Sequence, residues 1–151
     1  MRLKIYLDTS VPNAYFDESK LERQRETKDF WNRLIGYEVF ISQRVIEEIN
    51  ETPDAERRVR LRSLVEGFEI LASENEEVEN LALEYVAEGI IPLNHFDDAI
   101  HVATASVYKM DILVSWNYQH IVKLKTIRGV IAVNLLKGYN PLDIVDPVMV
   151  D

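Results

Sequence analysis

Short runs of strand-forming residues alternate with longer helical patterns along this chain, and this alternation constrains the fold most strongly. The run at residues 3–7 is mostly apolar, which is typical of a strand covered on both faces. Similar runs occupy residues 38–42, 111–115 and 130–133. Strands separated by helices predict an α/β fold with a mainly parallel central sheet.

The stretches between these runs carry apolar residues at helical spacing, together with residues that start or stop helices. Ser42 and Asp54 are suited to cap the helices that follow them, because their side-chain oxygens accept backbone N–H groups. Gly36, Gly89 and Gly129 follow helical patterns and are expected to end them. The helices expected from these signals span residues 19–35, 43–51, 55–66, 75–88, 95–109 and 118–127.

Two segments have less regular patterns. Residues 68–71 are interpreted either as a short strand or as an extended connector, and an irregular tail is expected from about residue 139. The length of 151 residues predicts one domain over residues 1–151. Several apolar residues near the C-terminus form either a partner surface or a segment that folds back; they are Leu135, Leu136, Ile144, Val145 and Val148.

The charge balance argues against a broad nucleic-acid-binding surface, because 26 acidic residues outnumber 17 basic ones and the net charge is −9. Four arginines nevertheless cluster at residues 57–62, where they form either a solvated helix face or a contact to RNA phosphates or an acidic partner. The absence of cysteine excludes disulfides, thiolate zinc sites and a cysteine nucleophile. With no signal-peptide pattern and no apolar stretch near 18 residues, we expect a cytoplasmic protein without membrane contact.

An acidic pair, Asp97 and Asp98, opens a helix whose other residues are small and apolar. Such a helix is expected to be buried, and burying carboxylates at its start is unfavourable for packing alone. The helix N-terminus offsets part of this cost, by about 0.3–1 kcal/mol. We therefore expect Asp97 to cap the helix and Asp98 to face a site. His101 is expected to be a hydrogen-bonded core or rim histidine rather than a catalytic base.

Three further polar residues are expected to lie near Asp98. Asp8 ends the first expected strand, Glu48 lies in the helix after the second, and Asn117 follows a later strand. In an open α/β sheet, ligands bind beyond the carboxyl ends of the strands, so these side chains are expected to meet at one edge. Crowded carboxylates repel one another unless a cation joins them. Oxygen ligands of this kind suit Mg²⁺ or Mn²⁺, which can lower the pKa of a water and stabilise charge on a phosphate.

The order of four short motifs resembles that of the PIN-domain family, over residues 3 to about 134. The motifs are Leu7-Asp8-Thr9-Ser10, Ser42-x-x-Val45-x-x-Glu48-Ile49, Asp98-Ala99-x-His101-x-Ala103-x-Ala105 and Leu113-Val114-Ser115-Trp116-Asn117-x-x-His120. The resemblance implies a three-layer α/β/α fold, a metal-dependent ribonuclease site and frequent homodimers. Many small bacterial and archaeal members, the VapC-like ones, are toxins that a cognate antitoxin holds inactive.

The same resemblance assigns roles to individual residues. Asp8, Glu48 and Asp98 match the three acids of the family's metal site, with Glu47 a rival for the position of Glu48. Many members carry a fourth acid where this chain has Asn117, which can bind a metal-bound water or a phosphate but adds no charge. The residues expected to contact substrate are Thr9, Ser10, Trp116 and His120.

These features predict an endoribonuclease that depends on Mg²⁺ or Mn²⁺, cleaves single-stranded RNA and acts as the toxin of a toxin–antitoxin pair. The alternative is a catalytically weakened PIN-like module that binds RNA or a protein partner without cleavage, which Asn117 favours. Phosphoryl transfer through an aspartyl intermediate is disfavoured, because residue 10 is a serine rather than a second aspartate. The alternatives to substrate contact are that Trp116 is a core residue and that His120 is a surface residue.

Overall fold

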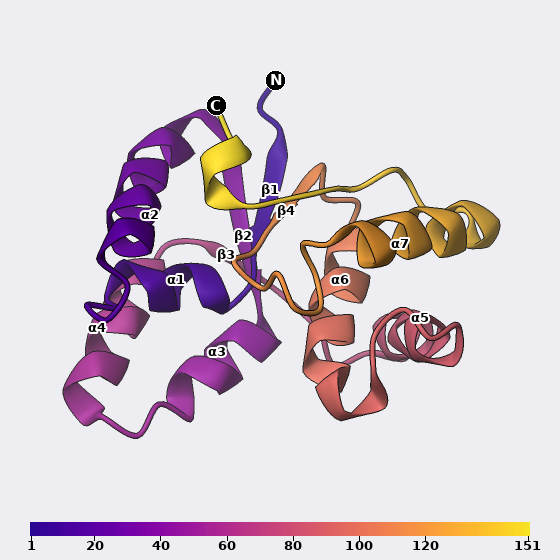
Figure 1. Cartoon of the computed structure of the whole chain (residues 1–151), viewed down its shortest axis with the longest axis horizontal. Helices are drawn as coiled ribbons and strands as arrows, with labels where there is room; N and C mark the ends of the chain where they lie inside the picture. The colour runs from indigo at the N-terminus through magenta and orange to yellow at the C-terminus, as the bar shows by residue number, and fades with distance from the viewer.

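The computed structural model of the protein describes residues 1–151 and has three layers, with a central sheet between two groups of helices (Figure 1). All five strands are parallel and lie in the order β3-β2-β1-β4-β5. The strands are β1 (Lys4–Leu7), β2 (Glu38–Ser42), β3 (Glu69–Leu71), β4 (Ile112–Val114) and β5 (Asp143–Val145). This arrangement confirms the three-layer α/β/α fold and the parallel sheet expected from the sequence.

Helices cover both faces of the sheet, as Figure 1 shows. One side carries α1 (Ser10–Tyr15), α2 (Leu21–Arg33) and α4 (Ala55–Val65), and the other carries α5 (Glu76–Ala87), α6 (Phe96–Val107) and α7 (Leu124–Lys137). The remaining helices are α3 (Gln43–Asn50) and the 3₁₀ turns η1 (Leu34–Gly36), η2 (Leu93–His95) and η3 (Pro147–Met149). None of these helices combines the length and the apolar character needed to cross a membrane.

The first strand lies at the centre of the sheet because it is apolar and covered on both faces. Residues Ile5–Leu7 are completely buried, and Ile5 pairs with Val39 on one side and with Ile112 on the other. Since the strands are parallel, their carboxyl ends share one edge of the sheet. Asp8 follows β1 at this edge, away from the two chain termini, which lie near each other at the opposite edge (Figure 1).

Local sequence signals start the helices that approach this edge. The Ser42 side chain accepts a hydrogen bond from the Val45 N–H at the start of α3. The Asp54 carboxylate accepts the N–H groups of Glu56 and Arg57 at the start of α4. Both expected caps are therefore confirmed, and each such cap stabilises a helix by about 1 kcal/mol.

The C-terminal part differs from the expectation. Residues 130–133, expected as a strand, belong to α7, and the fifth strand is β5, inside the segment expected to be an irregular tail. Gly129, expected to end a helix over 118–127, lies inside α7, where a Cβ would fall 2.6 Å from the side chain of Ile90. A helix forms here because the buried residues recur at helical spacing; they are Thr126, Val130, Val133 and Asn134.

The clustered arginines of α4 bind the fold itself. The Arg57 guanidinium donates to the carbonyl oxygens of Asn13 and Phe16, and Arg58 donates to that of Thr52. The other two arginines pair with side chains, Arg60 with Glu56 and Arg62 with Asn50. The cluster therefore ties α4 to α1 and to α3, which accounts for it without an RNA contact.

Candidate active site

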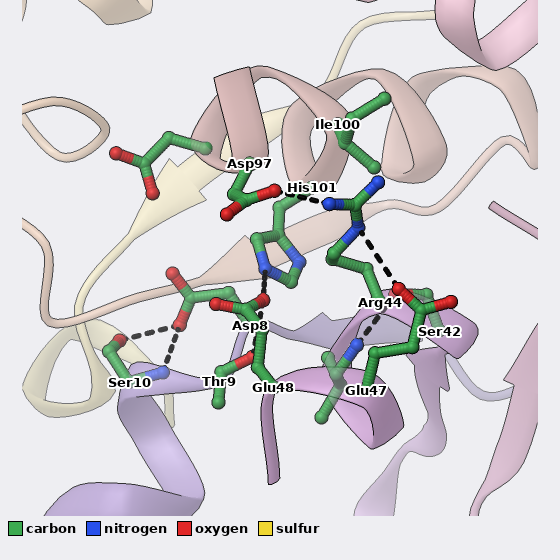
Figure 2. Close-up of polar contacts among 12 residues, drawn as sticks. Asp8, Thr9, Ser10, Ser42, Arg44, Glu47, Glu48, Asp97, Ile100 and His101 are labelled. Carbon is green, nitrogen blue, oxygen red and sulfur yellow. Dashed lines mark hydrogen bonds and ion pairs between the residues drawn. The ribbon is translucent and has the colours of Figure 1, made fainter. Parts of the chain in front are cut away.

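Asp8 is held in one orientation at the carboxyl edge of the sheet and is only 3% exposed. Its Oδ1 accepts hydrogen bonds from the Ser10 hydroxyl at 2.5 Å and the Ser10 N–H at 3.1 Å (Figure 2). Its Oδ2 accepts the Ser115 hydroxyl at 2.5 Å. Burial raises the pKa of Asp8, whereas the charge of His101 and the two serine hydroxyls lower it by less. The hydrogen bonds and the charge of His101 therefore do not fully offset the cost of burying a negative charge on Asp8.

Ser115 was not among the residues predicted for the site. Strands β1 and β4 pair in parallel with Leu7 opposite Val114, so Asp8 and Ser115 come next at the same edge. The one feature of the sequence that pointed to Ser115 is that it directly follows a strand, as Asp8 does. Without the strand order, however, the sequence cannot say which two strands are neighbours.

Glu48 reaches this edge from α3. Its Oε1 accepts the Thr9 hydroxyl at 3.0 Å and lies 2.6 Å from Nε2 of His101, while no hydrogen bond occupies Oε2 (Figure 2). Glu47 points instead toward Arg44, with 3.7 Å between its carboxylate and the guanidinium. Of the two rival glutamates, the structure therefore places Glu48 beside Thr9 and His101.

A buried chain of hydrogen bonds runs from Ser42 through Tyr6 and His101 to Glu48. The Tyr6 hydroxyl lies 2.6 Å from Nδ1 of His101 and 2.8 Å from Oγ of Ser42. Burial alone would lower the pKa of His101, but the hydrogen bond and charge of Glu48 outweigh burial and raise it. Burial likewise opposes ionisation of Glu48, yet His101 and Thr9 bring the pKa of Glu48 below its usual value. His101 is thus a hydrogen-bonded core histidine, as expected, and it forms an ion pair with Glu48.

Asp98 lies in the first turn of α6, beside the same edge. Burial raises the pKa of Asp98, while the charge of His101 and a hydrogen bond with Asn117 lower it by less. Asp97 points away and forms an ion pair with Arg44 (Figure 2). No side chain caps α6, so the prediction that Asp97 caps this helix was wrong.

The turn after β4 places Asn117 and His120 at the rim of the site. The side-chain oxygen of Asn117 accepts the backbone N–H of His120 at 2.9 Å, which fixes the turn. The same Asn117 side chain favours the charged form of Asp98 and lowers its pKa. Burial and the charge of His95 lower the pKa of His120. An amide and an imidazole therefore occupy the turn where the resemblance to the PIN-domain family would place a fourth acid.

Trp116 lies in the core rather than at the rim. Its side chain is 7% exposed, and its indole N–H donates to the Thr27 hydroxyl at 2.9 Å. The Arg23 guanidinium covers the ring at 4.9 Å from the centroid. This placement contradicts the substrate-contact role predicted for Trp116 and agrees with the alternative of a core residue.

The donor set at this edge suits a hard divalent cation. Asp8, Glu48 and Asp98 come from three separate elements and offer carboxylate oxygens, the ligands that Mg²⁺ and Mn²⁺ prefer. The pKa of Asp8 is raised partly by the charge of Asp98, so the folded chain holds two acids that repel each other. A bound cation would remove this repulsion, and the residues therefore fit the metal that the sequence suggested.

Comparisons with known proteins agree with this geometry. A model of the PIN domain matches residues 5–120. Among solved structures, VapC20 of Mycobacterium tuberculosis, described as a sarcin–ricin loop cleaving toxin, superposes with a TM-score of 0.59 at 16% identity, covering 77% of this chain and 92% of that one.

Two further structures are similar over nearly the whole chain. One is VapBC2 from Rickettsia felis bound to a promoter DNA fragment, with a TM-score of 0.59, 14% identity, and coverage of 95% of this chain and 98% of that one. The other is DNA-bound VapBC from Salmonella typhimurium, with a TM-score of 0.57, 16% identity and coverage of 96% and 98%. At these identities the structures establish a shared fold. No curated protein matches the sequence.

Proposed function

Because this chain belongs to the PIN-domain family, we propose that it is a ribonuclease that uses Mg²⁺ or Mn²⁺ to cleave single-stranded RNA. The observation that supports the proposal is that Asp8, directly after β1, Glu48 in α3 and Asp98 in the first turn of α6 lie at one edge of the sheet, where the charge of Asp98 acts on Asp8. A nuclease of this class hydrolyses a phosphodiester bond and needs acids to hold its cation.

Each acid has a role that follows from its contacts. Asp8, Asp98 and the free Oε2 of Glu48 would hold the cation, Glu48 directly or through water. When bound, the cation would supply a water of lowered pKa and stabilise negative charge on the phosphate. Ser10 and Ser115 keep the Asp8 carboxylate in one orientation, because their hydroxyls donate to its two oxygens.

The remaining residues position these acids or the RNA. Thr9 and His101 both donate to Oε1 of Glu48, which keeps Glu48 ionised and directs its other oxygen outward. Thr9 and Ser10, predicted as substrate contacts, are therefore assigned to positioning the acids. Asn117 lies at the rim beside Asp98, where we assign it contact with the RNA phosphate. The ring nitrogens of His120 are shielded from solvent, so the substrate contact predicted for His120 is not part of this assignment.

Cleavage of a mixed pool of single-stranded RNA tests this proposal. Purified protein is incubated with Mg²⁺, Mn²⁺ or EDTA, alongside Asp98→Asn and Asp97→Asn. These neighbouring aspartates form a matched pair, because Asp97 binds Arg44 and points away from the other acids. We expect metal-dependent cleavage by wild type and Asp97→Asn, and loss of cleavage in Asp98→Asn. Equal cleavage in EDTA, or full activity of Asp98→Asn, would contradict the proposal.

The second candidate is a PIN-like module that binds RNA or protein without cleavage. It is favoured by Asn117, which contributes an amide where a carboxylate would add charge for a second cation. Under this alternative, Mn²⁺ and RNA bind to wild type but the RNA stays intact. Binding of labelled RNA, measured beside cleavage in the same samples, separates the two candidates.

We also propose that the protein is the toxin of a toxin–antitoxin pair and forms a homodimer. Support comes from the shared fold with structures of VapBC complexes and from apolar side chains on α7, where Leu135 and Leu136 are 77% and 85% exposed. Ile144, another predicted member of this surface, is buried in β5 instead. Light scattering of wild type and Leu136→Glu tests the homodimer: a dimer that persists unchanged in the variant excludes this part of α7 as the interface.

A further inference from the structure

Two histidines and one aspartate gather at the rim of the sheet edge. His95 ends η2, Asp98 lies in the first turn of α6, and His120 lies in the turn between β4 and α7. Each offers one ligand atom, and the three atoms lie within 4.8 Å of one another. In particular, Nδ1 of His95 is 3.9 Å from Oδ2 of Asp98. Ligands about 2.0–2.1 Å from a tetrahedral ion are separated by roughly 3.3 Å, so the three side chains must rotate toward one another to bind one ion.

The His120 ring has no partner for either nitrogen. Its Nδ1 and Nε2 are both shielded from solvent, and neither makes a hydrogen bond. The ring is nevertheless well placed, because the His120 N–H donates to Asn117 and its carbonyl accepts the Thr126 hydroxyl. Buried polar atoms without partners are unusual, and a bound ligand is one explanation for them. This observation is independent of how close the three residues lie.

The two imidazoles also lie against each other. The ring centroids of His95 and His120 are 3.8 Å apart, with 32° between the ring planes. Imidazole binds a metal through a nitrogen lone pair in the ring plane, so one ring must turn out of this stack for both to bind one ion. The turn at Asn117 places His120 near Asp98 in the first turn of α6, and the charges of both histidines act on Asp98.

We propose that His95, Asp98 and His120 form a binding site for a borderline divalent transition-metal ion, with Zn²⁺ as the representative. Two imidazole nitrogens and one carboxylate oxygen, with a coordination position left for water, are a common zinc ligand set. This set differs from the oxygen-only set of Asp8, Glu48 and Asp98. The inference does not rest on the proposed ribonuclease function, although both sites use Asp98.

Calorimetric titration of the tag-free protein with Zn²⁺ tests the site, with Co²⁺ absorption spectra as a second readout. The variants are His95→Asn, His120→Asn, Asp8→Asn, which alters the oxygen-only set, and, as the control, Asp97→Asn, whose carboxylate pairs with Arg44. We expect wild type and Asp97→Asn to bind a single Zn²⁺ with equal affinity, and Asp8→Asn to retain Zn²⁺ binding. Each histidine variant should bind at least about tenfold more weakly, since losing even an outer-shell partner of a metal ligand has that effect. Circular dichroism verifies that the variants are folded.

Two results would overturn this inference: no Zn²⁺ binding by wild type, or unchanged binding by both histidine variants. Intense visible absorption of the Co²⁺ complex that disappears in His95→Asn supports a low-coordinate site with nitrogen ligands. Failure here is distinguishable from failure of the ribonuclease proposal, because the latter is measured as Mg²⁺- or Mn²⁺-dependent cleavage and its dependence on Asp8. Loss of Zn²⁺ binding in Asp8→Asn would instead place the ion among the oxygen ligands and contradict the histidine site.

Discussion

Nε2 of His101 lies 2.6 Å from Oε1 of Glu48, although 53 residues separate them along the chain. This ion pair joins α6 to α3 at the carboxyl edge of the sheet, and Tyr6 extends it into the core. The histidine side chain is almost fully buried, and Glu48 is its only charged hydrogen-bond partner. The pair therefore affects both the stability of the fold and the orientation of a proposed metal ligand.

The free energy of unfolding is expected to depend on pH through this pair. The folded pKa of Glu48 is below 4.5, so its contribution is present above about pH 4.5 and is lost as pH falls through that lowered pKa. The folded pKa of His101 is above 6.5, so its contribution is present below about pH 6.5 and is lost as pH rises through that raised pKa. Between about pH 4.5 and pH 6.5, Glu48 and His101 therefore both make their full contribution to the free energy of unfolding.

Urea unfolding of wild type and Glu48→Gln, in EDTA and from acidic to alkaline pH, measures this dependence. We expect Glu48→Gln to be less stable by about 1–3 kcal/mol, because the buried histidine loses a charged partner. The difference should be largest between the two unperturbed pKa values, 4.5 and 6.5. A difference that does not vary with pH would show that the pair is not ionised.

Asp98→Asn is expected to stabilise the metal-free protein. The raised pKa of Asp98 means that its stabilising contribution is present below about pH 3.8 and is lost as pH rises through the folded pKa. At neutral pH the charge therefore destabilises the fold, and its removal should add on the order of 1 kcal/mol, or roughly 2–4 °C in Tm. Thermal unfolding in EDTA measures this, with Asp97→Asn as the control that should not be stabilised.

The same experiment in Mn²⁺ should reverse the order of stability. A cation at 100 times its Kd stabilises the folded state by about 2.7 kcal/mol. Wild type and Asp97→Asn should gain this increment, whereas Asp98→Asn should gain little. Identical Mn²⁺-induced shifts in all three proteins would mean that Asp98 does not bind the cation.

Glu48→Gln and Glu47→Gln should differ sharply in RNA cleavage. Glu48 presents a free carboxylate oxygen beside Asp8, while Glu47 faces Arg44. We expect cleavage to fall by about 100-fold or more in Glu48→Gln, as for loss of a positioned catalytic carboxylate. Glu47→Gln should cleave at the wild-type rate. Initial rates on one RNA under identical Mn²⁺ concentration make the comparison, and similar losses in both variants would refute the assignment.

Asn117→Asp should strengthen cation binding at the expense of stability without metal. In wild type the Asn117 side chain lowers the pKa of Asp98, and a carboxylate there would instead repel Asp98. We expect a lower Tm in EDTA, a larger increase in Tm with Mn²⁺, and faster cleavage. Asn117→Ala is the control, because it removes the amide without adding charge. A lower Mn²⁺ affinity in Asn117→Asp would place the cation away from this turn.

Gly129→Ala should destabilise the protein, although alanine favours helices. The added Cβ would lie 2.6 Å from Cγ1 and 2.8 Å from Cδ1 of Ile90. Overpacking of this kind costs about 1–3 kcal/mol, against a helix-propensity gain of about 1 kcal/mol. Urea unfolding of Gly129→Ala, Ile90→Ala and the double variant forms a cycle. We expect Ile90→Ala to relieve the effect of Gly129→Ala, and strict additivity would contradict a steric origin.

Local patterns identify most of the elements but not all. Ser42 and Asp54 start helices through contacts within a few residues, so the sequence alone locates those helix starts. Residues 130–133 have strand propensity yet form part of α7, because packing against Ile90 and α5 selects a helix. The final strand, β5, is only three residues long and gains stability from pairing with β4. Such a short strand has no strong local pattern.

Local sequence patterns were enough to propose the three carboxylates, because Asp8 follows an apolar strand, Asp98 opens a buried helix and Glu48 lies in a helix capped by Ser42. Their contacts appear only in the folded chain: the Ser115 hydroxyl donates to Asp8, the His101 imidazole pairs with Glu48, and His95 lies 3.9 Å from Asp98. The difference is one of sequence distance. Strand and helix signals act over a few residues, whereas the first two of these contacts join segments that become neighbours only when the strands assemble in the order β3-β2-β1-β4-β5.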